Sequence, residues 1–292
     1  MSVLTGTAGA ADEPVAVGTV RSRPGPTLIT GAVLVALVVL TALVSFVWTP
    51  HDPTLVDATA RLAGPSPAHW LGTDKLGRDV ASQLMVGART TLYVGVVAVG
   101  LAAVVGIPTG LVAAMSGRVV SEVLMRGADL LLAFPALLLA IMLAAVYGAS
   151  TLTAMVAIGI ATAPSFARIT RSGALTVLRS DYVLAARSAG RRRAGIAVHH
   201  VLPNVTSLLI VQASVSFAIA VLAEAALSFL GFGTPPPTPS WGRMLQESQE
   251  LLFVAPSLAV YPGVAIAVAV LGFNLLGDGL RDALDPRLAG IR

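Results

Sequence analysis

Long stretches of this chain carry no charged side chain, and this feature restricts its fold more than any other. About 20 consecutive apolar residues are enough for a helix to cross a membrane. Only 12% of the 292 residues are charged, too few to cover the surface of a soluble protein of this size. The sequence therefore predicts an all-α integral membrane protein. Its expected spans are residues 27–48, 90–115, 126–147, 151–167, 204–227 and 253–276.

Several functional classes are excluded by missing residue patterns. The chain has no cysteine, which excludes disulfides, thiolate catalysis and cysteine-type zinc sites. It has no phosphate-binding loop of the G-x-x-x-x-G-K-[ST] type, since its only lysine is Lys75. The four histidines lack the H-E-x-x-H spacing of metalloproteases; they are His51, His69, His199 and His200.

The basic residues indicate the orientation of the chain rather than contact with nucleic acid, because they lie between apolar stretches. Residues 1–26 are small and polar and predict a flexible cytoplasmic tail. With six spans, both ends then lie in the cytoplasm. Five of the 19 lysines and arginines fall outside and the other 14 inside, as the positive-inside rule requires. The outside set is Arg61, Lys75, Arg78, Arg89 and Arg243.

Three polar connections join the expected spans. Two are extracytoplasmic, residues 49–89 and 231–250, and the second contains the non-helical run GTPPPTPSWG. The third is cytoplasmic, residues 168–203, and includes YVLAARSAGRRRAGIAVHHVLP. In that stretch, Asp181 suits a helix start and Gly190 a helix end, so we expect a helix, a glycine turn, a second helix over 192–201 and then the fifth span.

The cytoplasmic connection has two interpretations on composition alone. Ala185 and Ala186 are small enough for a partner backbone to approach closely, and Arg187 suits an acidic partner. The alternative is a solvated basic loop that only sets the orientation of the chain.

The spacing favours the first interpretation. Ala185-Ala186, three residues, Gly190, nine residues and His200-Val201-Leu202-Pro203 together resemble the EAA loop of ABC importer permeases. Two positions depart from that pattern: Leu184 replaces a frequent glutamate, and His200 a usual isoleucine.

Three further segments resemble the peptide branch of the same family: HWLGTDKLGRDVASQLMVGARTTLYVG (69–95), AEAALSFLGFGTPPPTPSWGRML (223–245) and GDGLRDALDPRL (277–288). The resemblance covers residues 27–288 and is closest to the second, C-type permease of dipeptide or oligopeptide importers. Nickel importers share these motifs. It implies a type I ABC importer permease fold over 27–288, in a bacterial cell membrane.

The resemblance also implies partners. Such a permease is not itself an enzyme and needs no cofactor of its own. It pairs with a second, similar permease, rests on two cytoplasmic ATPase domains that bind ATP and Mg²⁺, and receives peptide from an extracytoplasmic binding protein. ATP-driven closure would tilt the coupling loop and switch the helices between inward- and outward-facing states. The coupling residues carried over by the motif are Ala185, Ala186, Arg187, Gly190, Leu202 and Pro203.

A self-contained secondary transporter is the main rival class, and it would need ionisable groups inside its spans. Glu224 is the charged residue that lies well inside an expected span. It could face the translocation path, or bond the partner permease or a nearby loop. Gln212 could line the path or bond a neighbouring helix. A receptor or scaffold lacks a large soluble ligand-binding domain and does not explain the EAA spacing.

Two smaller expectations concern charged stretches near the membrane surfaces. The spacing of Glu122, Arg126 and Asp129 predicts a mutual ion-pair ladder at the inner interface. Residues 73–89 have an apolar helical face and predict a helix lying along the outer interface. Three charged residues in that stretch would hold the outer loop or meet the binding protein: Asp74, Arg78 and Asp79.

Overall fold

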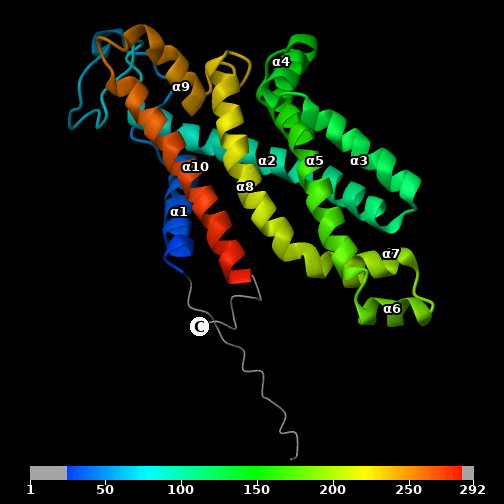
Figure 1. Ribbon diagram of the computed structural model, residues 1–292. Helices are drawn as coiled ribbons and strands as arrows, with labels where there is room; N and C mark the ends of the chain where they lie inside the picture. Colours follow the sequence, from blue (N-terminus) through cyan, green and yellow to red (C-terminus); the bar gives the residue numbers. More distant parts are fainter. Residues whose placement is uncertain (1–24, 285–292) are drawn as a thin grey trace, which may run out of the picture.

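The computed structural model describes residues 25–284, and its helices follow the apolar stretches of the sequence (Figure 1). Most of the expected cytoplasmic tail, residues 1–24, and the last residues, 285–292, lie outside the described part. Apart from one isolated bridge between Thr73 and Asp79, the described residues contain no β-structure. The all-α prediction is confirmed.

Five helices are long and apolar enough to cross a membrane, and a bent pair of helices gives a sixth crossing if the pair is counted as one span. The long helices are α1 (Pro26–Val47), α2 (Val80–Met115), α5 (Thr151–Val177), α8 (Leu202–Phe229) and α10 (Ser257–Leu284). The bent pair is α3 (Arg118–Ala133) and α4 (Ala136–Tyr147). The short helices are α6 (Asp181–Ser188), α7 (Arg193–Ile196) and α9 (Trp241–Ser248).

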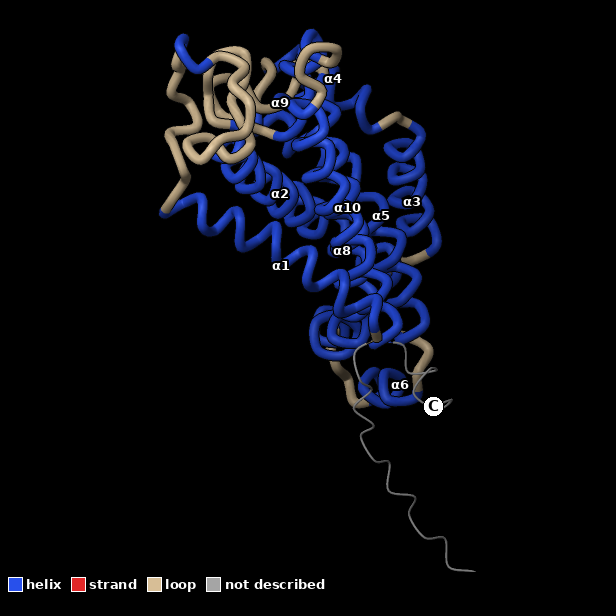
Figure 2. Tube along the Cα trace, turned by 90° about the vertical axis from the view of Figure 1, so that its left-hand side faces the viewer, coloured by secondary structure: helices blue, strands red, loops and turns tan. Residues whose placement is uncertain are grey.

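Successive crossings run in opposite directions, so the connections gather at two ends of the molecule (Figures 1 and 2). One end carries α6 and α7 and is called the α6 end. The other carries α9 and the long connection before α2, and is called the α9 end. The start of α1 and the finish of α10 both lie at the α6 end (Figure 1), as an even number of crossings requires.

The sequence predicts the third crossing as a single helix that begins near residue 126, and the structure differs from this prediction. The crossing begins earlier, at Arg118, and breaks between α3 and α4 with a bend of 84°. Pro135 causes the break, because it has no N–H to donate and forces Phe134 out of the helical region, to ψ 127°. The expected turn at residues 147–150 is confirmed: Gly148 has a positive φ of 86°, and Ser150 caps α5.

The second crossing also begins earlier than predicted. The Asp79 carboxylate accepts a hydrogen bond from the backbone N–H of Ser82 at 2.8 Å and so caps α2 at its first turn. The helix then continues without a break from Val80 through the membrane. The prediction of a separate interfacial helix over residues 73–89 is therefore wrong. The apolar residues of that stretch lie partly in a turn and partly in the first turns of α2.

The expected ion-pair ladder on α3 forms only in part. Arg126 pairs with Glu122 at 3.3 Å, one helical turn away. Asp129 pairs instead with Arg168 of α5. This second pair exists because α5 continues past its predicted limit near residue 167, to Val177, and brings Arg168 alongside α3.

The centre of the bundle is the close contact of α2 with α5. Gly106 and Gly110 of α2 lie directly against α5. A Cβ atom on Gly106 would be 2.4 Å from the carbonyl oxygen of Ala163, and one on Gly110 would be 2.4 Å from that of Ala167. Small residues four apart allow helix backbones to approach in this way within membranes. Phe166, which is fully buried, fills the space beside them.

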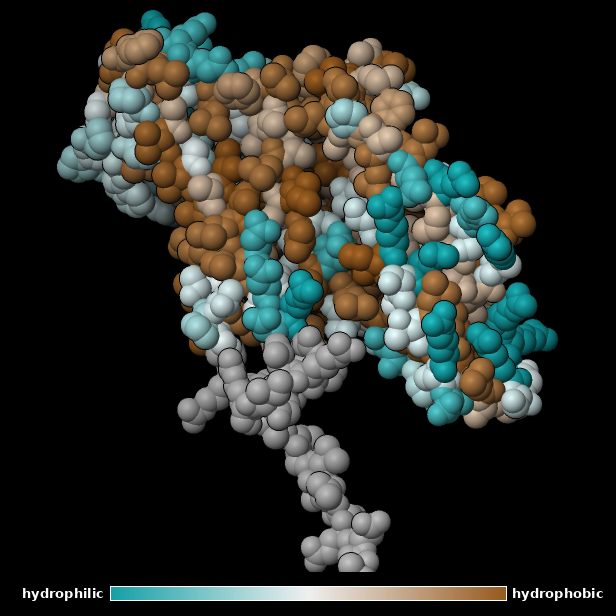
Figure 3. Space-filling model, viewed as in Figure 1, coloured by the Kyte–Doolittle hydropathy of each residue, from teal (hydrophilic) through white to brown (hydrophobic). Residues whose placement is uncertain are grey.

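Apolar side chains also cover much of the outside of the bundle. Figure 3 shows brown, hydrophobic surface over the middle of the bundle, whereas hydrophilic residues gather at lower right, where α3, α6 and α7 lie, and at upper left, near α9 and the long connection before α2. Exposed apolar residues such as Leu37 and Leu40 of α1 are what a bilayer or a membrane partner covers.

At the α9 end, Arg78 joins two connections that are distant in the sequence. Its guanidinium pairs with Asp74 at 2.6 Å and with Glu247 of α9. Burial by itself would lower the pKa of Arg78, but the two carboxylates raise it above its ordinary value. Of the two roles expected for Asp74 and Arg78, the contacts show the first, which is to hold the loop.

Candidate functional site

The coupling segment, defined here as residues 181–203, lies between α5 and α8 at the α6 end. Asp181 stands in the first turn of α6 and Arg187 in its last turn, where each charge suits the helix dipole. Gly190 then reverses the chain with a positive φ of 77°, and the backbone N–H of Arg191 donates to the carbonyl of Ala186 at 3.1 Å. The predicted helix, glycine turn and second helix are all present.

The second helix differs in one detail from its prediction. It is α-helical only over α7 and becomes a π-helical turn at residues 197–201 before α8 begins. The Asn204 amide donates to the His200 carbonyl at 2.6 Å, and the His199 ring contacts the Gly195 carbonyl at 3.1 Å. These bonds give polar partners to carbonyls near the junction of α7 and α8.

One side of the coupling segment is anchored in the core of the bundle. Val183 of α6, Ile196 of α7 and Val201 are each 1% exposed or less, and they join the main hydrophobic cluster with residues of α2, α5 and α8. Burying each of these side chains contributes roughly 1.5–3 kcal/mol. The segment is therefore a fixed extension of α5 and α8.

The other side is exposed and basic. Three arginines line a hollow beside the end of α2, together with Met115 and Ile196: they are Arg187, Arg191 and Arg193. None of the three has a carboxylate partner within 4.0 Å among the described residues. The hollow is consequently an electropositive surface suited to an acidic partner.

Most of the proposed coupling residues are exposed to a partner. Ala185, Arg187, Gly190 and Pro203 are exposed, whereas Ala186 and Leu202 are half-buried. The two positions that depart from the EAA pattern lie among them.

Leu184 is 48% exposed, as is Tyr182. His200 lies edge-on to the Tyr182 ring at 6.1 Å, and its Nε2 is 3.3 Å from an Arg191 nitrogen. The histidine thus links α6 to the junction of α7 and α8.

The two candidates for the substrate path lie on α8, and each has a partner within this chain. The Gln212 amide donates to Ser216 on the same helix at 2.9 Å, and its side chain is half-buried. Glu224 is 1% exposed and accepts a hydrogen bond from Ser228 at 2.7 Å. Ser228 in turn accepts from the backbone N–H of Thr234, in the connection after α8.

A bundle of apolar helices with six crossings, carrying an anchored basic segment at one end, defines a multi-pass membrane protein. The chain belongs to the family of binding-protein-dependent transport system inner membrane components, whose model matches residues 106–290. That match includes the whole coupling segment.

Proteins similar to this chain are transport permeases. The dipeptide transport system permease protein DppC of Alkalihalophilus pseudofirmus is 40% identical over 89% of this chain and 86% of its own length. The glutathione transport system permease protein GsiD of Pectobacterium atrosepticum is 42% identical over 77% of this chain and 75% of its own length. The probable D,D-dipeptide transport system permease protein DdpC of Escherichia coli is 38% identical over 92% of this chain and 90% of its own length.

A solved structure shares the fold. It is an inward-facing form of the MetNI methionine ABC transporter, with a TM-score of 0.58 over 70% of this chain and 97% of the other, at 18% identity. The type I importer permease fold implied by the sequence motifs is therefore confirmed, and the chain is a membrane transport component.

Proposed function

We propose that this chain is the transmembrane subunit of an ATP-driven importer of dipeptides or oligopeptides. It forms half of the translocation path together with a second permease and works by alternating access. Three similar permeases are named for the transport of dipeptides, glutathione and D,D-dipeptides, which are all peptides. These names favour peptide cargo over the nickel chelates that some permeases with the same motifs carry.

The observation that carries the mechanism is the two-sided coupling segment. Its buried side chains join it to the bundle, while Arg187 and the residues around Gly190 stay free for a partner. Gly173 of α5 packs against α8, and a Cβ atom there would lie 2.9 Å from Val205. A push on the coupling segment therefore moves α5 and α8 together, which is what rigid-body switching requires.

The proposed partners follow from the two ends of the molecule. The arginine-lined α6 end faces the cytoplasm, as the distribution of basic residues indicates. There it docks on two ATPase domains that bind ATP and Mg²⁺, for which this chain has no phosphate-binding loop. The α9 end faces outward and receives the substrate-binding protein.

Gln212 remains our candidate for the path, since its side chain is half-buried and, within residues 25–284, its side-chain partner is on its own helix. The contacts of Glu224 favour its alternative role as a support for the loop after α8. A self-contained secondary transporter would instead move substrate in liposomes with this chain alone. We expect no such transport without the ATPase domains.

The coupling proposal is tested by reversing one charge. We expect Arg187→Glu to lower ATP-dependent peptide uptake at least about tenfold, because it places a negative charge where an acidic partner docks. Arg281→Glu is the matched control, since Arg281 is also exposed near the α6 end but lies on α10. Uptake by membrane vesicles and co-purification of the ATPase are both measured.

A second variant tests the shape of the same surface. Gly190→Trp places a bulky side chain at a positive φ and should also uncouple ATP hydrolysis from uptake. Gly117→Trp is its control, because Gly117 is exposed in the connection between α2 and α3 at an ordinary φ of −66°. Normal transport and normal ATPase assembly in Gly190→Trp would refute the docking role.

A further inference from the structure

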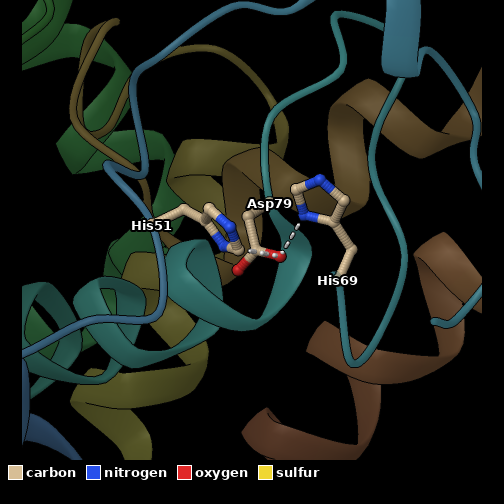
Figure 4. Close-up of side chains that lie close together, drawn as sticks. All are labelled: His51, His69 and Asp79. Carbon is tan, nitrogen blue, oxygen red and sulfur yellow. Dashed lines mark hydrogen bonds and ion pairs between the residues drawn. The ribbon is translucent and has the colours of Figure 1, made fainter. Parts of the chain in front are cut away.

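We propose that His51, His69 and Asp79 form a binding site for one divalent transition-metal ion at the α9 end (Figure 4). The three residues come from separate parts of the chain: the segment after α1, the middle of the long connection, and the N-cap of α2. The site is distinct from the coupling segment at the opposite end and from the proposed peptide path.

The donor atoms already have nearly the separation that a metal requires. One oxygen of Asp79 lies 2.9 Å from Nδ1 of His69 and 3.7 Å from Nδ1 of His51. All three donor atoms lie within 4.8 Å of one another. Ligands about 2.0–2.1 Å from a tetrahedral zinc ion are roughly 3.3 Å apart, a value between the two observed distances.

The two oxygens of the Asp79 carboxylate have different partners, because one faces the two histidines. The other oxygen accepts hydrogen bonds from the backbone N–H and the hydroxyl of Ser82, at 2.8 and 2.7 Å. Burial raises the pKa of Asp79, but the hydrogen bonds from Ser82 and His69 outweigh it and lower the pKa below its ordinary value. The hydrogen bonds from Ser82 thus fix the carboxylate so that its other oxygen faces the two histidines.

Both histidines are also fixed through their backbones. The N–H of His51 donates to the hydroxyl of Ser82 at 2.9 Å. The carbonyl of His69 accepts from the N–H groups of Ser66 and Gly72, at 2.8 and 3.0 Å. Their rings lie 4.5 Å apart between centroids, on the two sides of the Asp79 carboxylate in Figure 4. Such outer contacts orient metal ligands before the ion arrives.

The ring nitrogen Nδ1 of His51 is not accounted for by the hydrogen bonds around it. This atom is buried and has no hydrogen-bond partner among the described residues. Buried polar atoms nearly always have a partner. The orphaned nitrogen points to a ligand beside Asp79, and a metal ion there would bond it.

The donor set identifies the class of ion. Two imidazoles and one carboxylate suit zinc and its first-row neighbours better than calcium or magnesium, which prefer oxygen ligands only. Three protein ligands leave a fourth position for water or for a group from a partner. The bound ion would tie the end of α1 to the start of α2.

The test is zinc binding to the full chain, purified with its partner subunits through a histidine-free tag and stripped with a chelator. We expect one zinc ion per chain at this site by calorimetry. X-ray absorption should show about two imidazole ligands, at the zinc–nitrogen distance of about 2.0–2.1 Å. This measurement on the unmutated protein does not depend on the folding of any variant.

Substitutions assign the site to these residues. We expect His51→Ala, His69→Ala and Asp79→Asn each to weaken zinc binding at least about tenfold. Asn still caps a helix, so Asp79→Asn removes the charged ligand without removing the start of α2. His199→Ala and His200→Ala are the controls, because these are the other two histidines of the chain and lie at the α6 end.

Absence of one-to-one zinc binding, or equal affinity in His51→Ala and the unmutated protein, overturns the proposal. Loss of binding in the His199→Ala or His200→Ala control, with binding intact in His69→Ala, would move the site to the α6 end and also overturn it. None of these outcomes bears on coupling to the ATPase, so the proposed transport function is tested independently.

Discussion

Glu224 has a carboxyl group enclosed between its own helix and the connection that follows it. The carboxylate oxygen Oε1 accepts from Ser228, while Oε2 is buried with no hydrogen-bond partner among the described residues. Ser228 links it to Thr234. A carboxyl group in this position orders the chain where it leaves α8, and contact with cargo would require these bonds to open.

We expect Glu224→Ala to destabilise the purified protein by about 1–3 kcal/mol, because the Ser228 hydroxyl loses its acceptor in a buried place. Glu224→Gln keeps an acceptor and should melt close to the unmutated protein. Thermal melting in detergent measures both. A changed peptide preference in Glu224→Gln would instead return Glu224 to the substrate path.

The sequence predicts the roles of residues that depend on local backbone geometry. It does not predict the roles of residues that depend on contacts between distant parts of the chain. Gly190 and Asp181 show their roles through neighbours in the chain, by helix-end rules alone. His51, His69 and Asp79 are widely separated in the sequence and lack a known metal-binding spacing. Only the folding of the long connection brings them together, so sequence reasoning missed them as a group.

At the scale of the helices, the close pairing of α2 with α5 is the contact most sensitive to added volume. We expect Gly106→Ala to cost about 1–3 kcal/mol, since the new Cβ would clash with the Ala163 carbonyl, which is backbone and cannot move aside. Thermal melting in detergent measures the loss.

Gly100→Ala provides the control on the same helix. A Cβ atom at Gly100 meets nothing within 4 Å, so this variant should melt at or slightly above the temperature of the unmutated protein. If both alanines were tolerated equally, the α2–α5 contact would be looser than described.

The positions of the apolar crossings could be predicted from apolar length, because a membrane demands a minimum stretch. Their ends could not, for two different reasons. The break in the third crossing depends on one residue, Pro135, inside an uncharged run. The extension of α5 to Val177 depends on partners such as Asp129, which pairs with Arg168 across helices.

For the whole molecule, an even number of crossings places the two ends of the described chain together and the two sets of connections on opposite faces. The chain contains no cysteine, so single cysteines report sidedness without background. We expect Val56→Cys, exposed at the α9 end, to react in intact cells with a maleimide that cannot cross membranes.

Ala189→Cys, exposed at the α6 end, should react only after the cells are permeabilised. Labelling of Ala189→Cys in intact cells would reverse the proposed orientation and would place the coupling segment away from any cytoplasmic ATPase.

The salt bridges of Arg78 have a consequence for how the α9 end responds to thermal motion. They join the connection before α2 to α9, segments 169 residues apart in the sequence. If either segment loosens alone, the buried guanidinium of Arg78 loses one of its two carboxylate partners, which is costly. We therefore expect the two segments to open and close together, with shared hydrogen-exchange protection. The proposed binding protein would then meet a single platform assembled from both halves of the chain.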